Sequence, residues 1–183
     1  MNFLARWLKP DLYVQAVEDV SLDWLADRGV EGVLLDVDNT LTRWRSHDIP
    51  EARRAWVEAA KQRFSVCLIS NTIFGRRLKA LGAALDVPYV GRWGLGRKPS
   101  PAGVRAALKL AGVPAERACL IGDQVLTDIL GGKLCGLLTV LVEPVDPASE
   151  FVVTRIARFI ERPLRGAWRQ ELQGGGRDDE PDQ

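Results

Sequence analysis

The chain has 183 residues, of which 46% are hydrophobic and 27% are charged. This composition can bury one good core and little more, so we expect a single domain over residues 1–170. The formal net charge is +1, from 25 basic and 24 acidic residues, so overall charge does not attract nucleic acid and no nucleic-acid partner is expected. No apolar run approaches the roughly 20 residues that cross a bilayer, so no transmembrane segment is predicted.

Short apolar runs alternate along the chain with stretches of helical periodicity. This pattern is typical of a parallel sheet that is buried between two layers of helices. Five runs have the length and composition of strands: 32–35, 65–69, 87–90, 118–121 and 137–142. We therefore predict a three-layer α/β sandwich with a five-stranded, mainly parallel sheet.

The predicted helices have recognisable start and stop signals. Ser21 can cap a helix that runs toward Gly29, and Ser100 can cap a helix that Gly112 ends. Further helices are predicted from residue 51, over 74–85, over 124–135 and over 148–162. From Gly174 onward the sequence has no large apolar residue, so residues 171–183 are expected to form a disordered tail.

Cellular location is indicated by the cysteines and by the two ends of the chain. Cys67, Cys119 and Cys135 lie in apolar runs without metal-ligand spacing, which is typical of free core cysteines in a reducing cytoplasm. Both ends mix aromatic and basic residues, as interfacial segments do, although such stretches are more often core-packing helices. We predict a cytoplasmic protein, with peripheral contact at the inner membrane face as a hypothesis. The end residues are Phe3, Arg6, Trp7, Leu8, Lys9, Arg158, Phe159, Arg162, Leu164, Arg165 and Trp168.

Polar residues follow four of the predicted strands at their carboxyl ends, where open α/β sheets bind ligands. Helix caps or surface ion pairs could explain any one of these residues, but a whole set at strand ends indicates a functional site. They are Asp36 and Asp38 after the first strand, Ser70 and Asn71 after the second, Lys98 beyond the third, and Asp123, Thr127 and Asp128 after the fourth.

The paired acids of the first strand indicate a metal ion. Two nearby carboxylates repel each other unless a cation or a proton separates them. A hard divalent ion resolves this conflict, and Mg²⁺ prefers oxygen ligands while keeping part of its water shell. We predict Mg²⁺ as the cofactor, with Asp36 and Asp123 as ligands, Asp128 in the second shell or on a metal-bound water, and Thr127 in the second shell.

The same residues can carry phosphoryl transfer. A carboxylate can attack phosphorus when a metal removes the repulsion between the two anions, and Asp36 is the predicted nucleophile. Asp38 is the predicted general acid and base, first for the leaving oxygen and then for the attacking water. Lys98 would neutralise the phosphoryl group and Ser70 would donate a hydrogen bond to it. Asn71 either binds substrate or shapes the site.

In this order and spacing the polar groups resemble the four motifs of the haloacid dehalogenase (HAD) superfamily. The motifs read Asp36-Val-Asp38-Asn-Thr40, Ser70-Asn71, Lys98-Pro99 and Gly122-Asp123 followed after four residues by Asp128. The resemblance covers residues 32–142 and implies a HAD-like Rossmannoid fold and a phosphoaspartate mechanism. It also implies that the backbone carbonyl of Asp38 joins the metal ligands.

Within the superfamily the chain is similar to the bacterial YqeG group of subclass IIIA phosphatases, and Thr127 in the last motif fits that group. The group is similar to eukaryotic phosphatidylglycerophosphate phosphatases. This similarity implies an anionic phospholipid substrate and a role in phospholipid synthesis. The residues themselves leave a sugar phosphate, a nucleotide or a phosphoprotein open as the substrate.

The spacing between the motifs predicts a capless enzyme. Residues 38–70 have room for a turn and one helix, and residues 70–98 for one helix and one strand. A lid normally sequesters a small metabolite from water, so an open site favours a bulky substrate. Several basic residues near the motifs could ring the site: Arg43, Arg45, Arg53, Arg54, Arg76, Arg77, Arg92 and Arg97.

A non-enzymatic phosphoacceptor is the alternative class of function, because signalling receiver domains also combine acids, Mg²⁺, a hydroxyl and a lysine on a parallel sheet. A receiver carries its phosphorylated aspartate on the third strand, whereas the run 87–90 has no acid. Asp38 also favours turnover over a long-lived phosphate. The sequence therefore favours the enzyme.

Overall fold

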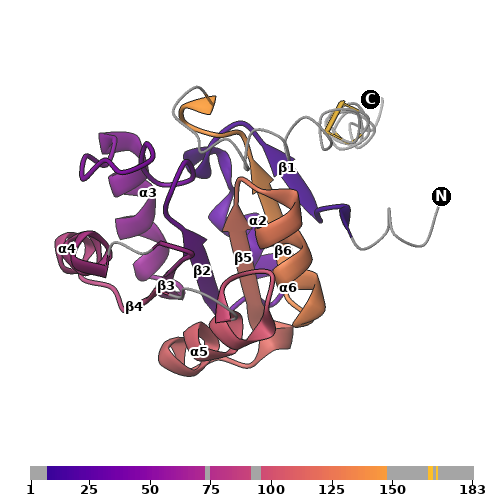
Figure 1. Cartoon of the computed structure of the whole chain (residues 1–183). Helices are drawn as coiled ribbons and strands as arrows, with labels where there is room; N and C mark the ends of the chain where they lie inside the picture. The colour runs from indigo at the N-terminus through magenta and orange to yellow at the C-terminus, as the bar shows by residue number, and fades with distance from the viewer. Residues whose placement is uncertain (1–7, 73–74, 92–95, 148–164, 167, 169–183) are drawn as a thin grey trace.

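The computed structural model describes residues 8–72, 75–91, 96–147, 165, 166 and 168, which form an α/β fold around a parallel sheet (Figure 1). The sheet has six strands in the order β1-β6-β5-β2-β3-β4, and all neighbouring pairs are parallel. The strands are β1 (Leu12–Val14), β2 (Gly32–Asp36), β3 (Ser65–Ser70), β4 (Tyr89–Gly91), β5 (Ala118–Gly122) and β6 (Leu138–Val142). The predicted α/β sandwich is confirmed.

The expected number of five strands is wrong by one, because β1 has no counterpart in the prediction. This strand has only three residues, too few to stand out as an apolar run. It lies at the edge of the sheet and pairs with β6. The Asp11 carboxylate just before it accepts hydrogen bonds from the backbone nitrogen and the hydroxyl of Thr139, at 2.8 Å and 2.9 Å. Tertiary pairing therefore creates a strand that local periodicity does not reveal.

The central strand, β2, is buried along its whole length and sends side chains to both faces of the sheet. Val33 and Leu35 belong to one core cluster, and Leu34 belongs to a second. The first cluster lies under α2, α3 and α4, and the second lies under α5. The helices are α2 (Leu22–Asp27), α3 (Glu51–Lys61), α4 (Gly75–Leu85), α5 (Pro101–Ala111) and α6 (Leu130–Leu134), with short 3-10 turns at Val17–Asp19 and Ala115–Arg117.

The capping predictions agree with the structure. The Ser21 hydroxyl accepts a hydrogen bond from the backbone of Trp24 at the start of α2, and Ser100 caps α5. Gly112 ends α5 with a φ of 71°, in the left-handed region that glycine adopts without a steric cost. Local sequence chemistry therefore sets these helix ends.

The single helix predicted over 124–135 is instead a π-helical turn, η4 (Val125–Ile129), that leads into α6. The backbone nitrogens of Asp128 and Ile129 both point at the carbonyl of Gln124, at 2.9 Å and 3.3 Å. A π turn is wider than an α turn, and such turns are frequent at functional sites. Here the wide turn carries Asp128.

Two residues near the C-terminus are part of the core. Trp168 packs in a buried cluster with Tyr13, Val125, Ile129 and Leu141, and Arg165 is buried as well. These two side chains are therefore not presented to a membrane surface. The helix predicted over 148–162, the tail over 171–183 and the other end residues, apart from the half-buried Leu8 and Lys9, lie outside the described residues.

The three cysteines are free, as predicted. Cys67 and Cys119 are buried, and Cys135 is half-buried. Burial raises the pKa of the Cys67 thiol to about 12, so this residue stays a neutral core side chain at physiological pH.

We propose that the domain extends through residue 170, and this can be tested at Trp168. Trp168→Ala should lower the free energy of unfolding by about 3 kcal/mol, because it opens a cavity against the sheet. The measurement is urea unfolding followed by circular dichroism. Leu110→Ala, at a side chain with 55% exposure, is the control and should change the value by about 0.5 kcal/mol or less. Equal effects of the two changes would contradict the packing role of Trp168.

Candidate active site

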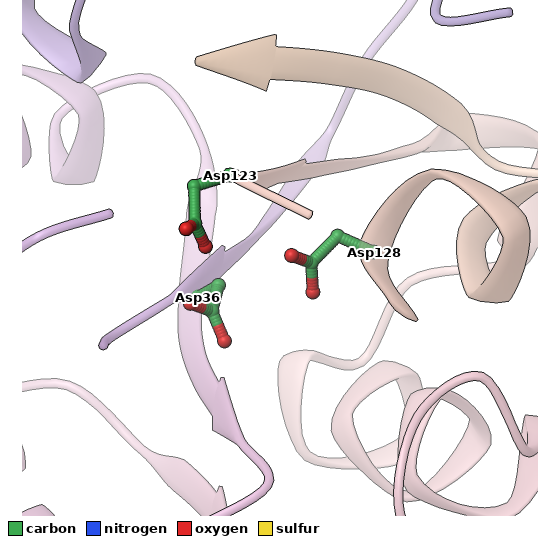
Figure 2. A group of neighbouring side chains, drawn as sticks. All are labelled: Asp36, Asp123 and Asp128. Carbon is green, nitrogen blue, oxygen red and sulfur yellow. The ribbon is translucent and has the colours of Figure 1, made fainter. Parts of the chain in front are cut away.

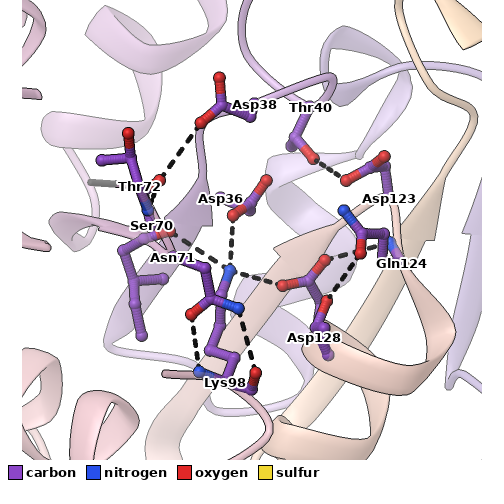
Figure 3. A network of polar contacts seen from close by, with 12 residues as sticks. Asp36, Asp38, Thr40, Ser70, Asn71, Thr72, Lys98, Asp123, Gln124 and Asp128 are labelled. Atoms are coloured by element: carbon purple, nitrogen blue, oxygen red, sulfur yellow. Dashed lines mark hydrogen bonds and ion pairs between the residues drawn. The ribbon is translucent and has the colours of Figure 1, made fainter. Parts of the chain in front are cut away.

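The predicted site residues meet at one edge of the sheet (Figure 3). Asp36 ends β2, Ser70 ends β3 and Asp123 directly follows β5. These three strands are adjacent and parallel, so their carboxyl ends lie side by side. Lys98 reaches the same place from the segment between β4 and α5. The topology therefore assembles a site from residues that are up to 92 positions apart in sequence, from Asp36 to Asp128.

Three carboxylates face one another at the centre of the site (Figure 2). Asp36, Asp123 and Asp128 each offer an oxygen, and these oxygens lie within 4.8 Å of one another. All three side chains are buried. Asp128 is thus as close to the centre as the two predicted ligands. Buried acids at such distances need a proton or a cation between them, and their oxygen atoms are the ligand type that a hard divalent ion prefers.

Lys98 compensates part of this negative charge. Its Nζ lies 2.5 Å from an oxygen of Asp36 and 2.5 Å from an oxygen of Asp128, and the residue is 1% exposed. Burial alone would lower the pKa of Lys98, but the carboxylates of Asp128 and Asp36 outweigh it and raise the pKa above its usual range. The lysine is therefore a permanent ammonium ion at physiological pH.

The surroundings of Asp36 favour its neutral form, whereas those of Lys98 favour its charged form. Burial, and then the negative charges of Asp128 and Asp123, raise the pKa of Asp36 well above its usual range, against the lowering effect of Lys98. The Lys98 ammonium carries one positive charge against the two negative charges of Asp36 and Asp128 when both are ionised, and Asp123 adds a third carboxylate to the same cluster. The donor set therefore fits a divalent cation, which would both neutralise the cluster and favour the ionised form of Asp36.

The position of Asp128 depends on a glycine. A Cβ added at Gly122 would lie 2.3 Å from the carboxyl carbon of Asp128. The space that a side chain at residue 122 would fill is occupied by this carboxylate, which also accepts a hydrogen bond from the backbone nitrogen of Gln124 at 3.0 Å. Only glycine before Asp123 lets the two acids of this motif converge.

Gly122→Ala should reduce the phosphatase activity that the motifs predict by at least about 10-fold, because the added methyl group displaces Asp128 from Lys98 and from the other acids. Activity is measured as phosphate release at saturating Mg²⁺, with circular dichroism as a folding check. Gly75→Ala is the matched control, since nothing lies within 4 Å of its added Cβ. Undiminished activity of a folded Gly122→Ala protein would contradict this account.

Asn71 holds the backbone of Lys98. Its side-chain nitrogen donates to the Lys98 carbonyl at 3.0 Å, and its side-chain oxygen accepts from the Lys98 backbone nitrogen at 2.6 Å. Both ends of the amide are thus used within the protein. The geometry favours the shaping role over the substrate-binding role that the sequence also allowed.

Asp38 lies at the outer side of the site, where its side chain is 21% exposed. One of its oxygens pairs with Arg77 at 2.8 Å and accepts from the backbone nitrogen of Arg45 at 3.3 Å. The other oxygen accepts from the Ser70 hydroxyl at 3.4 Å. Ser70 is therefore joined to Asp38 and lies next to Lys98, whose Nζ is 3.3 Å from the carbonyl of Ile69.

Local interactions determine the conformation of the turn after Asp36. Asn39 has a φ of 63°, in the left-handed region that asparagine tolerates better than most residues. Its backbone nitrogen donates to the Thr42 carbonyl at 2.8 Å, which closes the turn. Thr40 donates its hydroxyl to Asp123 at 3.2 Å and so links the first motif to the last. The sequence gave no signal for the contact between Thr40 and Asp123.

Thr127 does not join the acid cluster among the described residues. Its hydroxyl lies 3.5 Å from the side-chain oxygen of Gln124. The backbone carbonyl of Asp38 as a metal ligand stays a prediction.

The arginines near the motifs divide into two groups. Arg53 and Arg77 are buried and bonded within the protein, and the half-buried Arg54 donates to the carbonyl of Ala84. The exposed group, which can face an anionic partner, comprises Arg43, Arg45, Arg76 and Arg97, whereas Arg92 lies outside the described residues.

The chain resembles known proteins along most of its length. Residues 95–144 match the HAD-hydrolase-like family model. The chain is 31% identical over 169 residues to the probable phosphatase YqeG of Bacillus subtilis. The aligned region covers 92% of this chain and 95% of that protein. It is 29% identical over 173 residues to phosphatidylglycerophosphate phosphatase 1 of Arabidopsis thaliana. That aligned region covers 89% of this chain but only 49% of the plant protein. The chain thus spans about half the length of this plant relative.

A solved structure agrees with the fold. An uncharacterized protein from Listeria monocytogenes serotype 4b superposes with a TM-score of 0.51 at 18% identity, over 69% of this chain and 88% of that one.

The fold, the ordered motifs and these relatives define a phosphatase of the HAD superfamily. Within it, the chain belongs to the YqeG family. A phosphatase acts on a phosphorylated substrate, and the receiver-like alternative is therefore set aside. None of the helices in the described part of the chain has the length and apolar character to cross a membrane.

Proposed function

We propose that this phosphatase is a Mg²⁺-dependent phosphomonoester hydrolase that works through a phosphoaspartate on Asp36. The observation that carries the proposal is the environment of this carboxylate. One oxygen of Asp36 accepts a hydrogen bond from the Lys98 ammonium, and no hydrogen bond to the other oxygen is seen among the described residues. The first contact fixes the carboxylate, and the second oxygen has a lone pair available for attack.

The proposed reaction has two steps, with Asp38 as acid and then as base. In the first, the oxygen of Asp36 forms a bond to phosphorus, the ester P–O bond breaks, and Asp38 gives its proton to the leaving alcohol oxygen. In the second, water gives a proton to Asp38 and attacks phosphorus, and the bond between phosphorus and Asp36 breaks. The products are an alcohol and inorganic phosphate, and both aspartates return to their starting states.

The remaining residues support the phosphoryl group and its metal. Asp36, Asp123 and Asp128 are the proposed holders of Mg²⁺, with the Asp38 carbonyl as a further ligand. When bound, the ion supplies positive charge that lowers the repulsion between the nucleophile and the phosphate. Lys98 supplies a second positive charge, and Ser70 supplies a hydroxyl that can donate a hydrogen bond. Asn71 positions Lys98 through two hydrogen bonds to its backbone.

We propose phosphatidylglycerophosphate as the substrate, in phospholipid synthesis at the inner face of the membrane. The similarity to the Arabidopsis phosphatase supports this substrate. The described residues add two further supports: α3 is the only regular helix between β2 and β3, which leaves no room for a cap domain in that connection, and exposed arginines lie close to the first motif. A headgroup that is held in a membrane can itself cover an open site. A soluble sugar phosphate, nucleotide or phosphoprotein is the alternative.

Asp36→Asn should abolish turnover, with a loss of roughly 10⁴-fold or more, because the amide cannot form the phosphoaspartate. Phosphate release is measured from phosphatidylglycerophosphate in mixed micelles and from glycerol 3-phosphate, a soluble alkyl phosphate without lipid chains. Wild-type protein should act with Mg²⁺ and not with EDTA, and should strongly prefer the lipid. Equal release from both compounds would leave the mechanism standing and remove the lipid substrate.

Mg²⁺ should raise the melting temperature of the wild-type protein, because it neutralises the buried acids of the folded state only. The raised pKa of Asp36 sets the pH dependence. Without the ion, the stability that protonated Asp36 contributes is complete below its unfolded pKa and is lost as the pH rises through the folded value, so the benefit of Mg²⁺ should increase over the same range.

The effect of Mg²⁺ on the melting temperature is measured by thermal unfolding with and without the ion at several pH values. Asp123→Asn should remove most of the Mg²⁺-induced shift. Asp23→Asn, at an exposed acid on α2, is the control and should keep the full shift. A shift that survives Asp123→Asn unchanged would mean that the ion binds elsewhere.

A further inference from the structure

A buried arginine on α4 lies beside the acid that we assign to proton transfer. Arg77 is 5% exposed, and its Nη1 pairs with an oxygen of Asp38 at 2.8 Å. Its Nε donates to the carbonyl of Ser46 at 2.6 Å, and its Nη2 donates to the hydroxyl of Thr42 at 2.9 Å. The carbonyl of Arg43 lies within 3.5 Å of the same Nη2. One guanidinium thus joins α4, the loop 42–46 and Asp38.

The bonds of Arg77 differ in kind. Those to Ser46, Thr42 and Arg43 go to neutral groups of the loop, which fix the plane of the guanidinium. Asp38 is its one carboxylate partner among the described residues. Because the planar fork is held by the loop, its Nη1 points in a set direction. The orientation of the Asp38 carboxylate follows from that direction.

The other contacts of Asp38 are weaker. The Ser70 hydroxyl lies at 3.4 Å and the Arg45 nitrogen at 3.3 Å, whereas the Arg77 contact is 2.8 Å and carries opposite charge. A side chain that is partly exposed would otherwise populate several rotamers. A displacement of about 1 Å at a catalytic group can cost roughly 100-fold in rate, so an acid at the mouth of the site needs such a partner.

We propose that Arg77 is a positioning residue that aims Asp38 at the leaving oxygen. The inference rests on the proposed function, because it takes the acid and base role of Asp38 from there. A purely structural role is the competing explanation, in which Arg77 only holds α4 against the loop 42–46. The two explanations differ in how the loss of Arg77 depends on the leaving group.

The test compares two soluble esters of similar shape, phenyl phosphate and p-nitrophenyl phosphate. Nitrophenolate leaves as a stable anion and needs little help from an acid, whereas phenolate is more basic and needs a proton. The value of kcat/KM includes the steps up to departure of the leaving group. A misplaced acid should therefore reduce kcat/KM for phenyl phosphate much more than for p-nitrophenyl phosphate.

Arg77→Met should lower kcat/KM for phenyl phosphate at least about 10-fold more than for p-nitrophenyl phosphate, and Asp38→Asn should show the same preference. Arg77→Lys keeps one charged donor and should recover part of the loss. The double variant Arg77→Met with Asp38→Asn should be no worse on phenyl phosphate than Asp38→Asn alone, because both changes remove the same function.

Lys61→Met is the matched control, because Lys61 donates to the carbonyl of Leu85 and so ties the other end of α4 to α3. It should leave the ratio between the two esters unchanged. One outcome is that the Arg77 variants lose activity equally on both esters while Asp38→Asn still loses more on phenyl phosphate. That outcome would overturn the positioning role of Arg77 and leave the acid role of Asp38 standing. If Asp38→Asn also loses both activities equally, the acid role in the proposed function fails, and the inference fails with it. Arg77→Lys supplies the comparison where Arg77→Met does not fold.

Discussion

The site depends on one buried lysine that lies between two aspartates. Lys98 bonds to both Asp36 and Asp128, which come from the ends of β2 and of the π turn after β5. An ammonium ion at 1% exposure is tolerated only because carboxylates surround it, and the carboxylates are tolerated only because of the ammonium. The parallel strands bring the aspartates and the lysine together, and the attraction between their opposite charges then orients the side chains.

This constraint also explains the less conspicuous residues. Asn71 is used to hold the backbone of Lys98, since a lysine that must reach two acids needs a fixed starting point. Gly122 is required because the Asp128 carboxylate fills the space of its missing side chain. Thr40 gives a hydrogen bond to Asp123 and so relieves part of the burial cost of the third acid. Each is a consequence of placing three buried acids and one buried ammonium ion close together.

The sequence predicted the sheet and most of the site because both have local signals. Apolar runs mark strands, and a polar residue at the end of such a run marks the ligand edge, so Asp36, Ser70 and Asp123 could be named in advance. The three-residue β1 and the π turn arise from pairing and packing that no local window contains. The same holds for Arg77, which looks like an exposed arginine near a motif until α4 places it against Asp38.

The two aspartates of the first motif are only two residues apart, yet they lie in different surroundings. Asp36 is buried among acids and bonded to a lysine. Asp38 lies at the edge of the site, bonded to an arginine of α4 and partly open to solvent. A nucleophile needs a fixed direction and a neutralised phosphate, whereas an acid and base must exchange protons with alcohol and water. Different environments for neighbouring carboxylates can separate the two roles that we propose for Asp36 and Asp38. Asp36 ends β2, whereas Asp38 is followed directly by the turn at Asn39, so the two carboxylates are carried by different kinds of backbone.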